Sequence, residues 1–270
     1  MSHQRTALIT GASSGIGREL ARLAAAERHA LILVGRRQAA LELLADELRA
    51  SHGVAVRLYA HDLSEPNAAE QLWTALQQVD VTVDILVNNA GVGLYGPLAD
   101  QEPGAVDRMV QLNAGTLTSL TRLALPRMLQ RGWGRILNVA SMVGYQPGGP
   151  RMAAYYATKA YVLSFSKGLA RELRGSGVSV TAVAPGLTKS SFEEGLGGGA
   201  SETALYKWVP SMSASAVARA AYEGMQRQRT VVIPGWVAKL LAVAGELPPR
   251  WVALQVNSWL LRPVMPKHGA

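Results

Sequence analysis

The chain of 270 residues has the length of one large domain, and its 49% of hydrophobic residues against 17% of charged residues excludes a disordered protein. It contains no cysteine, which excludes a disulfide scaffold, thiol catalysis and zinc–thiolate sites, and its five histidines lack the spacing of metal ligands. The net charge of +8 favours an anionic ligand or surface, but there is no dense Lys/Arg block or nucleic-acid motif, so neither a nucleic-acid partner nor a metal is expected.

Short apolar segments alternate with longer amphipathic segments along the chain. The apolar segments predict seven strands, at residues 6–10, 30–34, 54–59, 84–89, 135–141, 178–184 and 230–233. They are rich in Val, Ile and Leu, and several are apolar throughout, which is typical of strands buried on both faces of a parallel sheet.

Helical patterns lie between the predicted strands. Apolar stripes at helical spacing cover residues 16–23 and 41–48, and Pro66 and Pro103 are expected to open two further helices. The repeated β-α-β order predicts an α/β fold: a Rossmann-like, doubly wound, seven-stranded, mostly parallel sheet with helices on both faces, in a single domain. The glycine-rich segment at 195–201 is expected to be a flexible loop.

The segment TGASSGIGREL directly follows the first predicted strand. Its Gly11, Gly15 and Gly17 stand at a strand-to-helix turn, where glycine lets the backbone approach a pyrophosphate and the helix offers its positive N-terminal end. The spacing differs from the G-x-G-x-x-G of the standard dinucleotide motif, and glycines in such a turn often serve the turn alone. The position between a strand and an amphipathic helix favours a dinucleotide site.

The end of the second predicted strand, LILVGRRQ, indicates which dinucleotide binds. An NAD site normally has an Asp or Glu here for the ribose 2′-hydroxyl, whereas this chain has Gly35, Arg36 and Arg37. Guanidinium groups suit a 2′-phosphate. Two solvated arginines at a strand end are the alternative, but the missing acid together with the two cations favours NADP (NADPH).

The segment AAYYATKAY at 153–161 places Tyr155 and Lys159 four residues apart, which is one face of a helix. A tyrosine and the aliphatic stem of a lysine often merely pack together on a helix surface. The pair is therefore a weak motif by itself, and the rest of the chain has to decide its meaning.

These motifs together resemble those of the short-chain dehydrogenase/reductases, from about residue 5 to residue 235. The matching segments, in order, are TGASSGIG (10–17), HDLS (61–64), NNAG (88–91), QLNAG (111–115), NVAS (138–141), YYATK (155–159) and APGLT (184–188). Each is modest alone, and the seven in order make the resemblance specific.

The resemblance implies four catalytic residues. Tyr155 would transfer the proton, Ser141 and Tyr155 would hold the substrate carbonyl, and Asn113 would belong to a proton relay. Lys159 would reach the ribose hydroxyls, and its positive charge, together with that of the nicotinamide in the oxidised complex, would lower the pKa of Tyr155, which in free tyrosine is about 10.

The resemblance also implies the cofactor-binding set. Its members are Gly11, Ser13, Ser14, Gly15, Ile16, Gly17, Arg36, Arg37, Asp62, Leu63, Asn89, Ala90, Gly91, Tyr155, Lys159, Pro185, Gly186 and Thr188. One departure stands between Ser141 and Tyr155, which are fourteen positions apart where many relatives have thirteen. The connecting loop therefore has one extra residue, near Gly148 and Gly149.

The implied reaction is NADP(H)-dependent interconversion of a carbonyl, in a ketone, an aldehyde or a 3-oxoacyl group, and an alcohol. A non-catalytic dinucleotide sensor or scaffold on the same fold is the first alternative, although the complete Ser-Tyr-Lys-Asn set speaks against it. A sugar-nucleotide epimerase or dehydratase is the second, and the roughly 80 residues that follow Pro185–Gly186 are short for the substrate domain of those enzymes.

Residues 1–235 are expected to form the dinucleotide-binding and catalytic domain. The apolar extension at 236–270 is expected to pack on the same domain or on a neighbouring subunit, with a pocket wall and a weak peripheral membrane contact as further interpretations. No signal peptide or membrane span is evident, so a cytoplasmic location is expected.

A homodimer or homotetramer is expected as well. The helix that starts near Tyr155 resembles the interface helix of the family. Ala160, Leu163 and Ala170 would lie on its apolar side and meet the neighbouring subunit.

Overall fold

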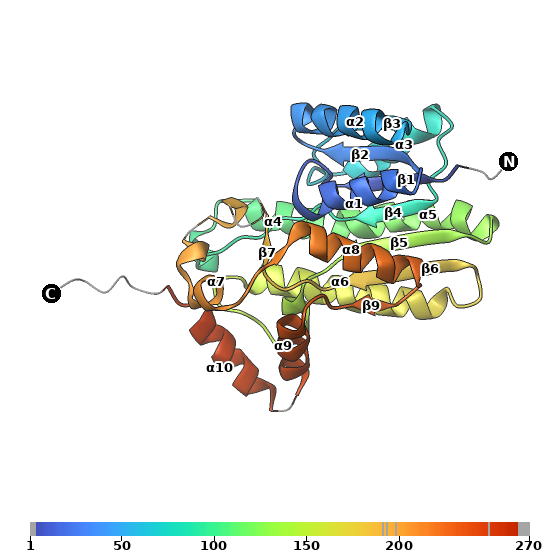
Figure 1. Cartoon of the computed structure of the whole chain (residues 1–270). Helices are drawn as coiled ribbons and strands as arrows, with labels where there is room; N and C mark the ends of the chain where they lie inside the picture. Colours follow the sequence, from blue (N-terminus) through green and yellow to red (C-terminus); the bar gives the residue numbers. More distant parts are fainter. Residues whose placement is uncertain (1–3, 191, 193, 198, 248, 264–270) are drawn as a thin grey trace.

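The computed structural model describes residues 4–263 except 191, 193, 198 and 248. Its centre is a sheet with the strand order β3-β2-β1-β4-β5-β6-β9, in which each neighbouring pair is parallel (Figure 1). The strands are β1 (Thr6–Thr10), β2 (Ala30–Gly35), β3 (Val56–Ala60), β4 (Ile85–Asn88), β5 (Gly134–Val139), β6 (Val178–Val183) and β9 (Val231–Val232). The predicted doubly wound fold is therefore confirmed.

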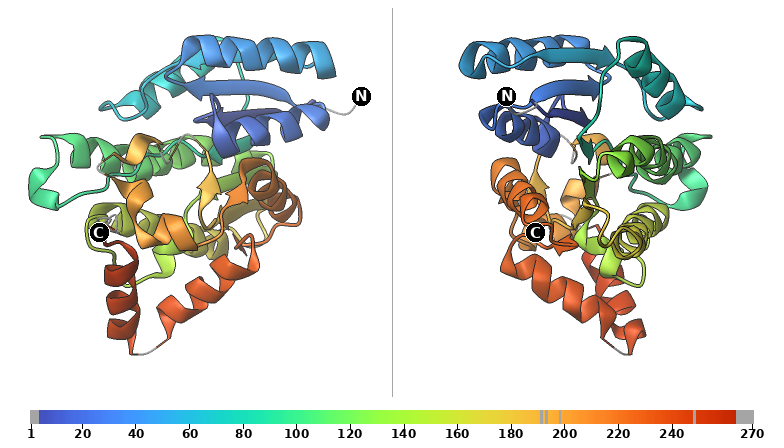
Figure 2. Two further views of the ribbon diagram at one scale, coloured as in Figure 1. Left: turned by 60° about the vertical axis from the view of Figure 1, so that its left-hand side comes forward. Right: turned by 90° about the vertical axis from the view of Figure 1, so that its right-hand side faces the viewer.

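Helices cover both faces of the sheet, as the two further views show (Figure 2). One face is covered by α1 (Gly15–Ala26), α2 (Gln38–His52) and α8 (Ala214–Gln226), and the other by α3 (Ala68–Gln78), α5 (Leu117–Gln130) and α6 (Ala153–Glu172). Alternate residues of one strand enter opposite cores, so Ile9 packs with the first group and Leu8 with the second. This explains why the strands are apolar throughout.

Two predicted helix starts are too early by two residues. The helix after Pro66 begins at Ala68, and α4 (Ala105–Val110) begins two residues after Pro103. In each case the preceding residue is left-handed, with φ of 59° at Asn67 and 75° at Gly104, which is incompatible with a continuing right-handed helix.

The glycine-rich segment at 195–201, for which a flexible loop was expected, has local helical turns. It contains parts of two short 3₁₀ turns, Glu194–Leu196 and Ala200–Glu202, and position 198 lies outside the described residues. Leu196 and Ala200 are buried in an apolar cluster, because their small neighbours let the chain turn tightly around them. A small second sheet, β7 (Thr188–Lys189) paired with β8 (Met212–Ser213), was not predicted and encloses this region.

The prediction for the surface of α6 needs a correction at Leu163. This side chain is buried in a cluster of the same chain, so it is not available to a neighbouring subunit. The residues exposed on this helix include Ala157, Tyr161, Ser164 and Gly168, one helical turn apart, and the Tyr161 ring stacks on Phe165.

The C-terminal extension forms a helical hairpin that projects from the body (Figures 1 and 2). It consists of α9 (Trp236–Glu246) and α10 (Arg250–Leu260), and α7 (Ala204–Trp208) lies against its upper end. Ala238 and Leu261 share an apolar cluster with Tyr155 and Tyr156. Within the described part of the chain, each helix is too short or too polar to cross a bilayer.

Candidate active site

The glycines after β1 are required by the shape of the first turn. Gly11 has φ of +64° and Gly15 has φ of +54°, both in the left-handed region that favours glycine. A Cβ at Gly17 would lie 2.4 Å from the carbonyl oxygen of Gly11 and 2.4 Å from the side-chain amide nitrogen of Asn89. The turn can therefore form only around bare backbone, which leaves the start of α1 open to a ligand.

Asn89 holds this turn in place. Its side-chain amide donates hydrogen bonds to the carbonyl oxygens of Thr10 at 2.9 Å and Gly11 at 3.1 Å. The Thr10 hydroxyl in turn accepts hydrogen bonds from the backbone amides of Asn89 and Ala90, at 3.0 Å each. Both hydrogen bonds of the Asn89 side-chain amide thus go to backbone carbonyl groups of the first turn. This side chain therefore positions the turn, and its remaining surface would contact a ligand.

Two arginines, Arg36 and Arg37, directly follow β2. Arg36 is mostly exposed, and its guanidinium lies 3.9 Å from a carboxylate oxygen of Asp62. Arg37 donates a hydrogen bond of 3.3 Å to the carbonyl oxygen of Ser13 in the first turn. Arg36 is therefore the freer of the two cations, while Arg37 braces the turn.

Asp62 follows β3 and accepts two hydrogen bonds from Ser64, at 2.9 Å from the backbone amide and 2.7 Å from the hydroxyl. Burial alone would raise the pKa of Asp62, but these hydrogen bonds and the charges of Arg36 and His61 together hold the pKa below its usual value. Asp62 is therefore an anion with a fixed orientation at the edge of the cavity.

Ser141, Tyr155 and Lys159 meet beyond the carboxyl ends of β5 and β6. Ser141 follows β5, while Tyr155 and Lys159 lie one turn apart on α6, and both α6 side chains are buried. Lys159 donates a hydrogen bond of 2.9 Å from Nζ to the carbonyl oxygen of Val139, and this nitrogen lies 5.8 Å from the centre of the Tyr155 ring. The Ser141 side chain interacts with the Tyr155 hydroxyl.

Burial governs the pKa values of Tyr155 and Lys159 in this structure. Burial raises the pKa of Tyr155 to about 12, although the interaction with Ser141 partly offsets this effect. Burial also lowers the pKa of Lys159 to about 8. The lowering expected from Lys159 together with an oxidised nicotinamide concerns the cofactor complex and stays a prediction. In this structure dehydration of the phenol dominates the Tyr155 pKa, and the Lys159 ammonium bonds to Val139.

Asn113 lies in a π-helical turn, Gln111–Thr116, between α4 and α5. Its side-chain amide donates to the carbonyl oxygen of Val92 at 2.8 Å and to the Thr158 hydroxyl at 3.1 Å, and its oxygen accepts from the Val92 amide at 3.0 Å. A Cβ at Gly91 would lie 3.1 Å from this oxygen. The side chain is therefore fully engaged, and π-helical turns often occur at functional sites.

One cavity of about 660 Å³ connects these groups. The predicted residues that line it are Gly11, Ser13, Ser14, Gly15, Ile16, Arg36, Arg37, Asp62, Leu63, Asn89, Ala90, Gly91, Ser141, Tyr155, Lys159, Pro185, Gly186 and Thr188. Gly17 and Asn113 are outside this lining. Gly17 lies directly against Gly11, and Asn113 is hydrogen-bonded to Val92, so both contact residues of the wall. The sequence motifs thus converge in space.

The far end of the cavity was not predicted in residue detail. Its walls include Tyr156 on α6, Phe192 and Leu205 in the segment after β7, and Trp236 and Leu241 on α9. The Phe192 ring lies 5.6 Å from the Tyr155 ring. The pocket-wall interpretation of the extension at 236–270 fits Trp236 and Leu241, which line the cavity. The alternation of aromatic and aliphatic residues between 190 and 235 has no fixed helix or strand period, so it did not indicate the part of the wall at Phe192 and Leu205.

The residues present fit a dinucleotide. Bare backbone at Gly11 and Gly15 opens on the N-terminus of the 12-residue helix α1, which suits a pyrophosphate. Arg36 is available beside the position where a ribose would lie, and Asp62 is fixed at the neighbouring strand end. The cavity continues from there to Ser141 and Tyr155, so a ligand bound along it reaches both.

The similarities to known proteins agree with this geometry. The family model of the short chain dehydrogenases matches residues 5–198. A short chain dehydrogenase of Pseudocercospora fijiensis is 38% identical over 191 residues, which is 70% of this chain and 61% of that relative, so this chain spans less than two thirds of the relative's length.

Two solved structures extend the similarity beyond the family model. A short-chain dehydrogenase from Sphingobium yanoikuyae in complex with NADPH is 36% identical, with a TM-score of 0.78, and the match covers 89% of this chain and 92% of that one. A bulky-bulky ketone specific alcohol dehydrogenase from Comamonas testosteroni is 32% identical, with a TM-score of 0.75, and the match covers 100% of this chain and 98% of that one.

Proposed function

Because this chain belongs to the short-chain dehydrogenase family, we propose that it is an NADP(H)-dependent oxidoreductase that interconverts a carbonyl and an alcohol. The observation that supports this most is the convergence of Ser141, Tyr155 and Lys159 in the cavity that starts at the glycine turn. One side of that cavity suits a dinucleotide and the other presents a hydrogen-bond donor and an acid.

Tyr155 acts as the general acid in carbonyl reduction. The nicotinamide supplies the hydride to the carbonyl carbon when the cofactor is bound. The carbonyl oxygen then gains negative charge, which the Ser141 hydroxyl stabilises by a hydrogen bond and the Tyr155 hydroxyl neutralises by giving up its proton. With a pKa raised to about 12, the Tyr155 hydroxyl is protonated at neutral pH and has a proton to give in the reductive direction.

Lys159 and Asn113 support this proton transfer. The Lys159 ammonium lies close enough to the Tyr155 ring to stabilise a phenolate, and it is near the position of a ribose beside Gly91. Asn113 keeps Val92 and Thr158 in place through its side chain, and it is the proposed member of a relay that returns a proton to Tyr155.

NADPH is the proposed cofactor, because no carboxylate stands at the end of β2. Gly35 occupies that place, and Arg36 next to it has a mostly exposed guanidinium. A 2′-phosphate carries about two negative charges and would pair with this cation. The NADPH complex of the Sphingobium relative is in line with this preference.

The proposed substrate is a ketone with two large apolar groups. The part of the cavity beyond Tyr155 has Phe192, Leu205, Trp236 and Leu241 in its walls, so an apolar substituent would be desolvated there. The Comamonas relative, whose match covers this whole chain, is named for bulky ketones. Small or charged carbonyl compounds would leave these apolar walls unoccupied or in contact with a charge.

A homodimer or homotetramer is also proposed. The exposed side of α6 that carries Ala157, Tyr161, Ser164 and Gly168 has small residues that allow close helix packing around one aromatic pair. Sedimentation at micromolar concentration would test this, and a monomer would contradict it.

The decisive experiment measures NADPH consumption with a panel of ketones that runs from acetone to diaryl ketones. We expect turnover that increases with apolar size and falls strongly with NADH. Binding of NADPH without turnover of any carbonyl would contradict the oxidoreductase and favour the alternative of a dinucleotide sensor.

A further inference from the structure

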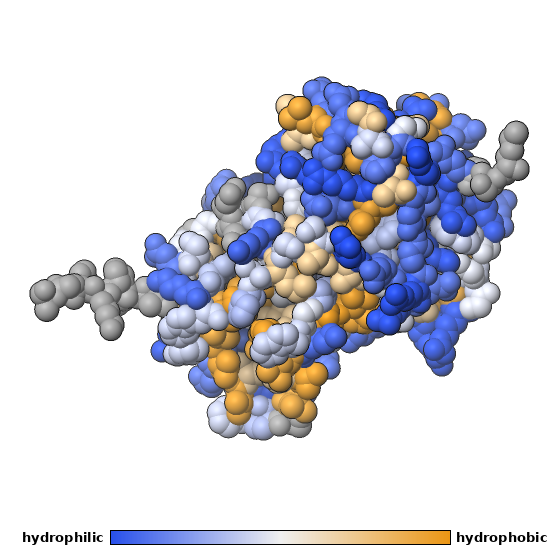
Figure 3. All heavy atoms as spheres, viewed as in Figure 1, coloured by the Kyte–Doolittle hydropathy of each residue, from blue (hydrophilic) through white to orange (hydrophobic). Residues whose placement is uncertain are grey.

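The helical hairpin exposes apolar side chains to a degree unusual for a surface. We define the hairpin face as the exposed large apolar residues of α7, α9 and α10 together with Leu247, which follows α9. Its members are Trp208, Trp236, Leu240, Val243, Leu247, Trp251, Val252, Leu254, Val256 and Trp259. It appears as the hydrophobic region over the projecting hairpin in Figure 3. It holds four of the six tryptophans of the chain. Contiguous apolar surface of this kind marks an interaction site.

The exposure is greatest on α10. Of its eleven residues, all described, Asn257 is the one that is buried. At 100° per residue the exposed positions extend from Leu254 through Trp251 to Val256, an arc of about 200°. A helix whose apolar side faces outwards while its asparagine faces inwards is inverted relative to a helix of a water-soluble domain.

The hairpin is nevertheless fixed to the body. Asn257 donates hydrogen bonds to the carbonyl oxygen of Gly148 at 2.7 Å and to the side-chain oxygen of Gln146 at 3.3 Å. Gln146 donates a hydrogen bond of 2.6 Å to the carbonyl oxygen of Leu241 on α9. The Tyr95 hydroxyl donates to the carbonyl oxygen of Leu261 at 2.7 Å. The apolar side chains are therefore held outwards by polar bonds on the inner side.

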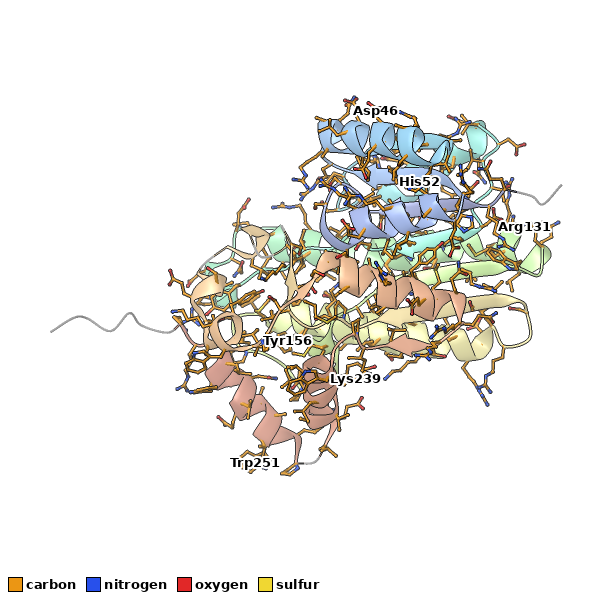
Figure 4. The ribbon with its side chains drawn as sticks, in the orientation of Figure 1. Asp46, His52, Arg131, Tyr156, Lys239 and Trp251 are labelled. Atoms are coloured by element: carbon orange, nitrogen blue, oxygen red, sulfur yellow. The ribbon has the colours of Figure 1, made fainter. Side chains whose placement is uncertain are left out.

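The charges around the hairpin face have mainly one sign. Between residues 236 and 263 the sequence has the basic residues Lys239, Arg250 and Arg262 and a single acid, Glu246. Lys207 on α7 adds another cation. Figure 4 shows Lys239 on α9 and Trp251 near the far end of the hairpin. Tryptophan rings and basic side chains around an apolar surface are the combination found where helices lie in a membrane interface.

We propose that the hairpin face binds an anionic lipid surface, with α9 and α10 lying along the interface. The apolar side chains enter the boundary between headgroups and acyl chains, the tryptophans lie at headgroup level, and the cations contact the lipid anions. The net charge of +8 strengthens the attraction.

A second copy of this chain fits the surface less well. A twofold contact would place two hairpin faces together, each with the basic Lys239, Arg250 and Arg262 and the single acid Glu246, so cations would outnumber acids across the interface. Anionic headgroups instead compensate all of these cations. The exposed side of α6, with Tyr161, is a separate surface, so an oligomer formed there leaves the hairpin free.

The hairpin also forms part of the cavity wall. Trp236 lines the cavity and is 75% exposed, and Leu241 lines it while its neighbour Leu240 is 61% exposed. A single helix, α9, therefore lies between the cavity and the proposed lipid surface. This step rests on the proposed function: an apolar ketone dissolved in the membrane would enter beside Trp236.

The test is co-sedimentation of the full chain, without cofactor or substrate, with vesicles of phosphatidylcholine alone or mixed with phosphatidylserine. We expect binding to the mixed vesicles that weakens with salt. Replacing Lys239 and Arg250 together by Gln should weaken it about thirtyfold, since each cation near an anionic surface contributes roughly a fivefold effect. Leu240→Ser with Trp251→Ser should abolish it.

Matched controls lie on the body. Leu43 is 74% exposed on α2, and Arg219 is exposed on α8, so Leu43→Ser and Arg219→Glu change an apolar and a basic side chain of similar exposure. Both should leave binding unchanged. Equal binding to neutral vesicles, or no binding to either kind of vesicle, would contradict the proposal. A shift of the hairpin variants to smaller species in sedimentation would contradict it as well, because it would show that a second copy covers the hairpin face. Vesicle binding by a protein that reduces no ketone would leave this inference intact and reject the function.

Discussion

The ammonium of Lys159 lies 5.8 Å from the centre of the Tyr155 ring and donates a hydrogen bond of 2.9 Å to the carbonyl oxygen of Val139. Two buried ionisable side chains thus share one cavity, and burial moves their pKa values towards the neutral forms. In the proposed reduction, a protonated Tyr155 phenol would be the state from which proton transfer starts.

Tyr155, and not Tyr156, is predicted to carry the proton transfer. Both rings are buried in the same cluster, but only Tyr155 interacts with Ser141, while Tyr156 packs against Gly149. Tyr155→Phe should lower kcat by about 10²- to 10⁴-fold with little change in the Kd for NADPH. Tyr156→Phe is the matched control and should keep most of the activity. If Tyr156→Phe is the inactive variant, the assignment is wrong.

Lys159 is predicted to make stability depend on pH. Its pKa is about 8 in the folded protein and 10.5 in the unfolded chain, so between these values the unfolded state binds more protons and stability rises with pH. The contribution is fully present above about pH 10.5 and is lost as the pH falls through about 8. Its full size is about 3 kcal/mol.

Urea unfolding of the wild type and of Lys159→Met over this pH range checks the prediction. The free energy of unfolding of the wild type should increase relative to that of the variant as the pH rises. A difference that does not change with pH would show that Lys159 is not dehydrated in the fold. The same variant should also bind NADPH more weakly if the ammonium contacts the ribose.

Much of the fold and of the site could be predicted from local sequence. Apolar segments predicted the strands because both faces of the sheet are covered, and parallel strands bring the ends of β1, β4 and β5 to one edge. That edge is where Gly11, Asn89 and Ser141 meet. Motifs at strand ends therefore converge without knowledge of the tertiary structure.

The parts that failed depend on contacts between distant segments. The burial of Tyr155, which raises its pKa, could not be predicted, because it depends on Phe192 and Ala238, and neither residue lies in a pattern that places it against this ring. The loop with one extra residue is likewise explained by the tail, since Gly148 has φ of +151° and its carbonyl oxygen accepts from Asn257, 109 residues away. Leu163 appeared to face outwards only because α6 is apolar on more than one side.

Asn257 is predicted to be a positioning residue for the loop that joins Ser141 to Tyr155. Asn257→Ala removes the donor to Gly148 and Gln146 and leaves the half-buried carbonyl oxygen of Gly148 and the buried side-chain oxygen of Gln146 without this partner, which should lower stability by about 1–3 kcal/mol. Because the loop joins Ser141 to Tyr155, KM for a bulky ketone should rise more than kcat falls. Asn257→Asp offers the same shape without the amide donor and should behave like Asn257→Ala. Ser258→Ala, at a more exposed neighbour, is the control and should change neither quantity.

The last prediction concerns the choice of cofactor at the end of β2. Arg36 is the mostly exposed cation beside Asp62, whereas Arg37 is bonded to the carbonyl oxygen of Ser13. Hydrogen bonds to charged groups contribute about 1.5–3 kcal/mol, so Arg36→Ala should weaken NADPH binding roughly ten- to a hundredfold and leave NADH nearly unchanged. Arg37→Ala should weaken both cofactors, since the bond it removes holds the turn that binds the part common to both.

Gly35→Asp tests the same site in the opposite direction. A Cβ at Gly35 would lie 3.4 Å from the Ser13 hydroxyl, an ordinary contact, so the new side chain has room. Its carboxylate would repel the 2′-phosphate of NADPH and offer the 2′-hydroxyl of NADH a partner, which combines a penalty for one cofactor with a gain for the other. The measurement is kcat/KM with both cofactors for the wild type, Arg36→Ala, Arg37→Ala and Gly35→Asp. A wild type that prefers NADH, or an Arg36→Ala variant that loses both cofactors equally, would contradict recognition of the 2′-phosphate at this strand end.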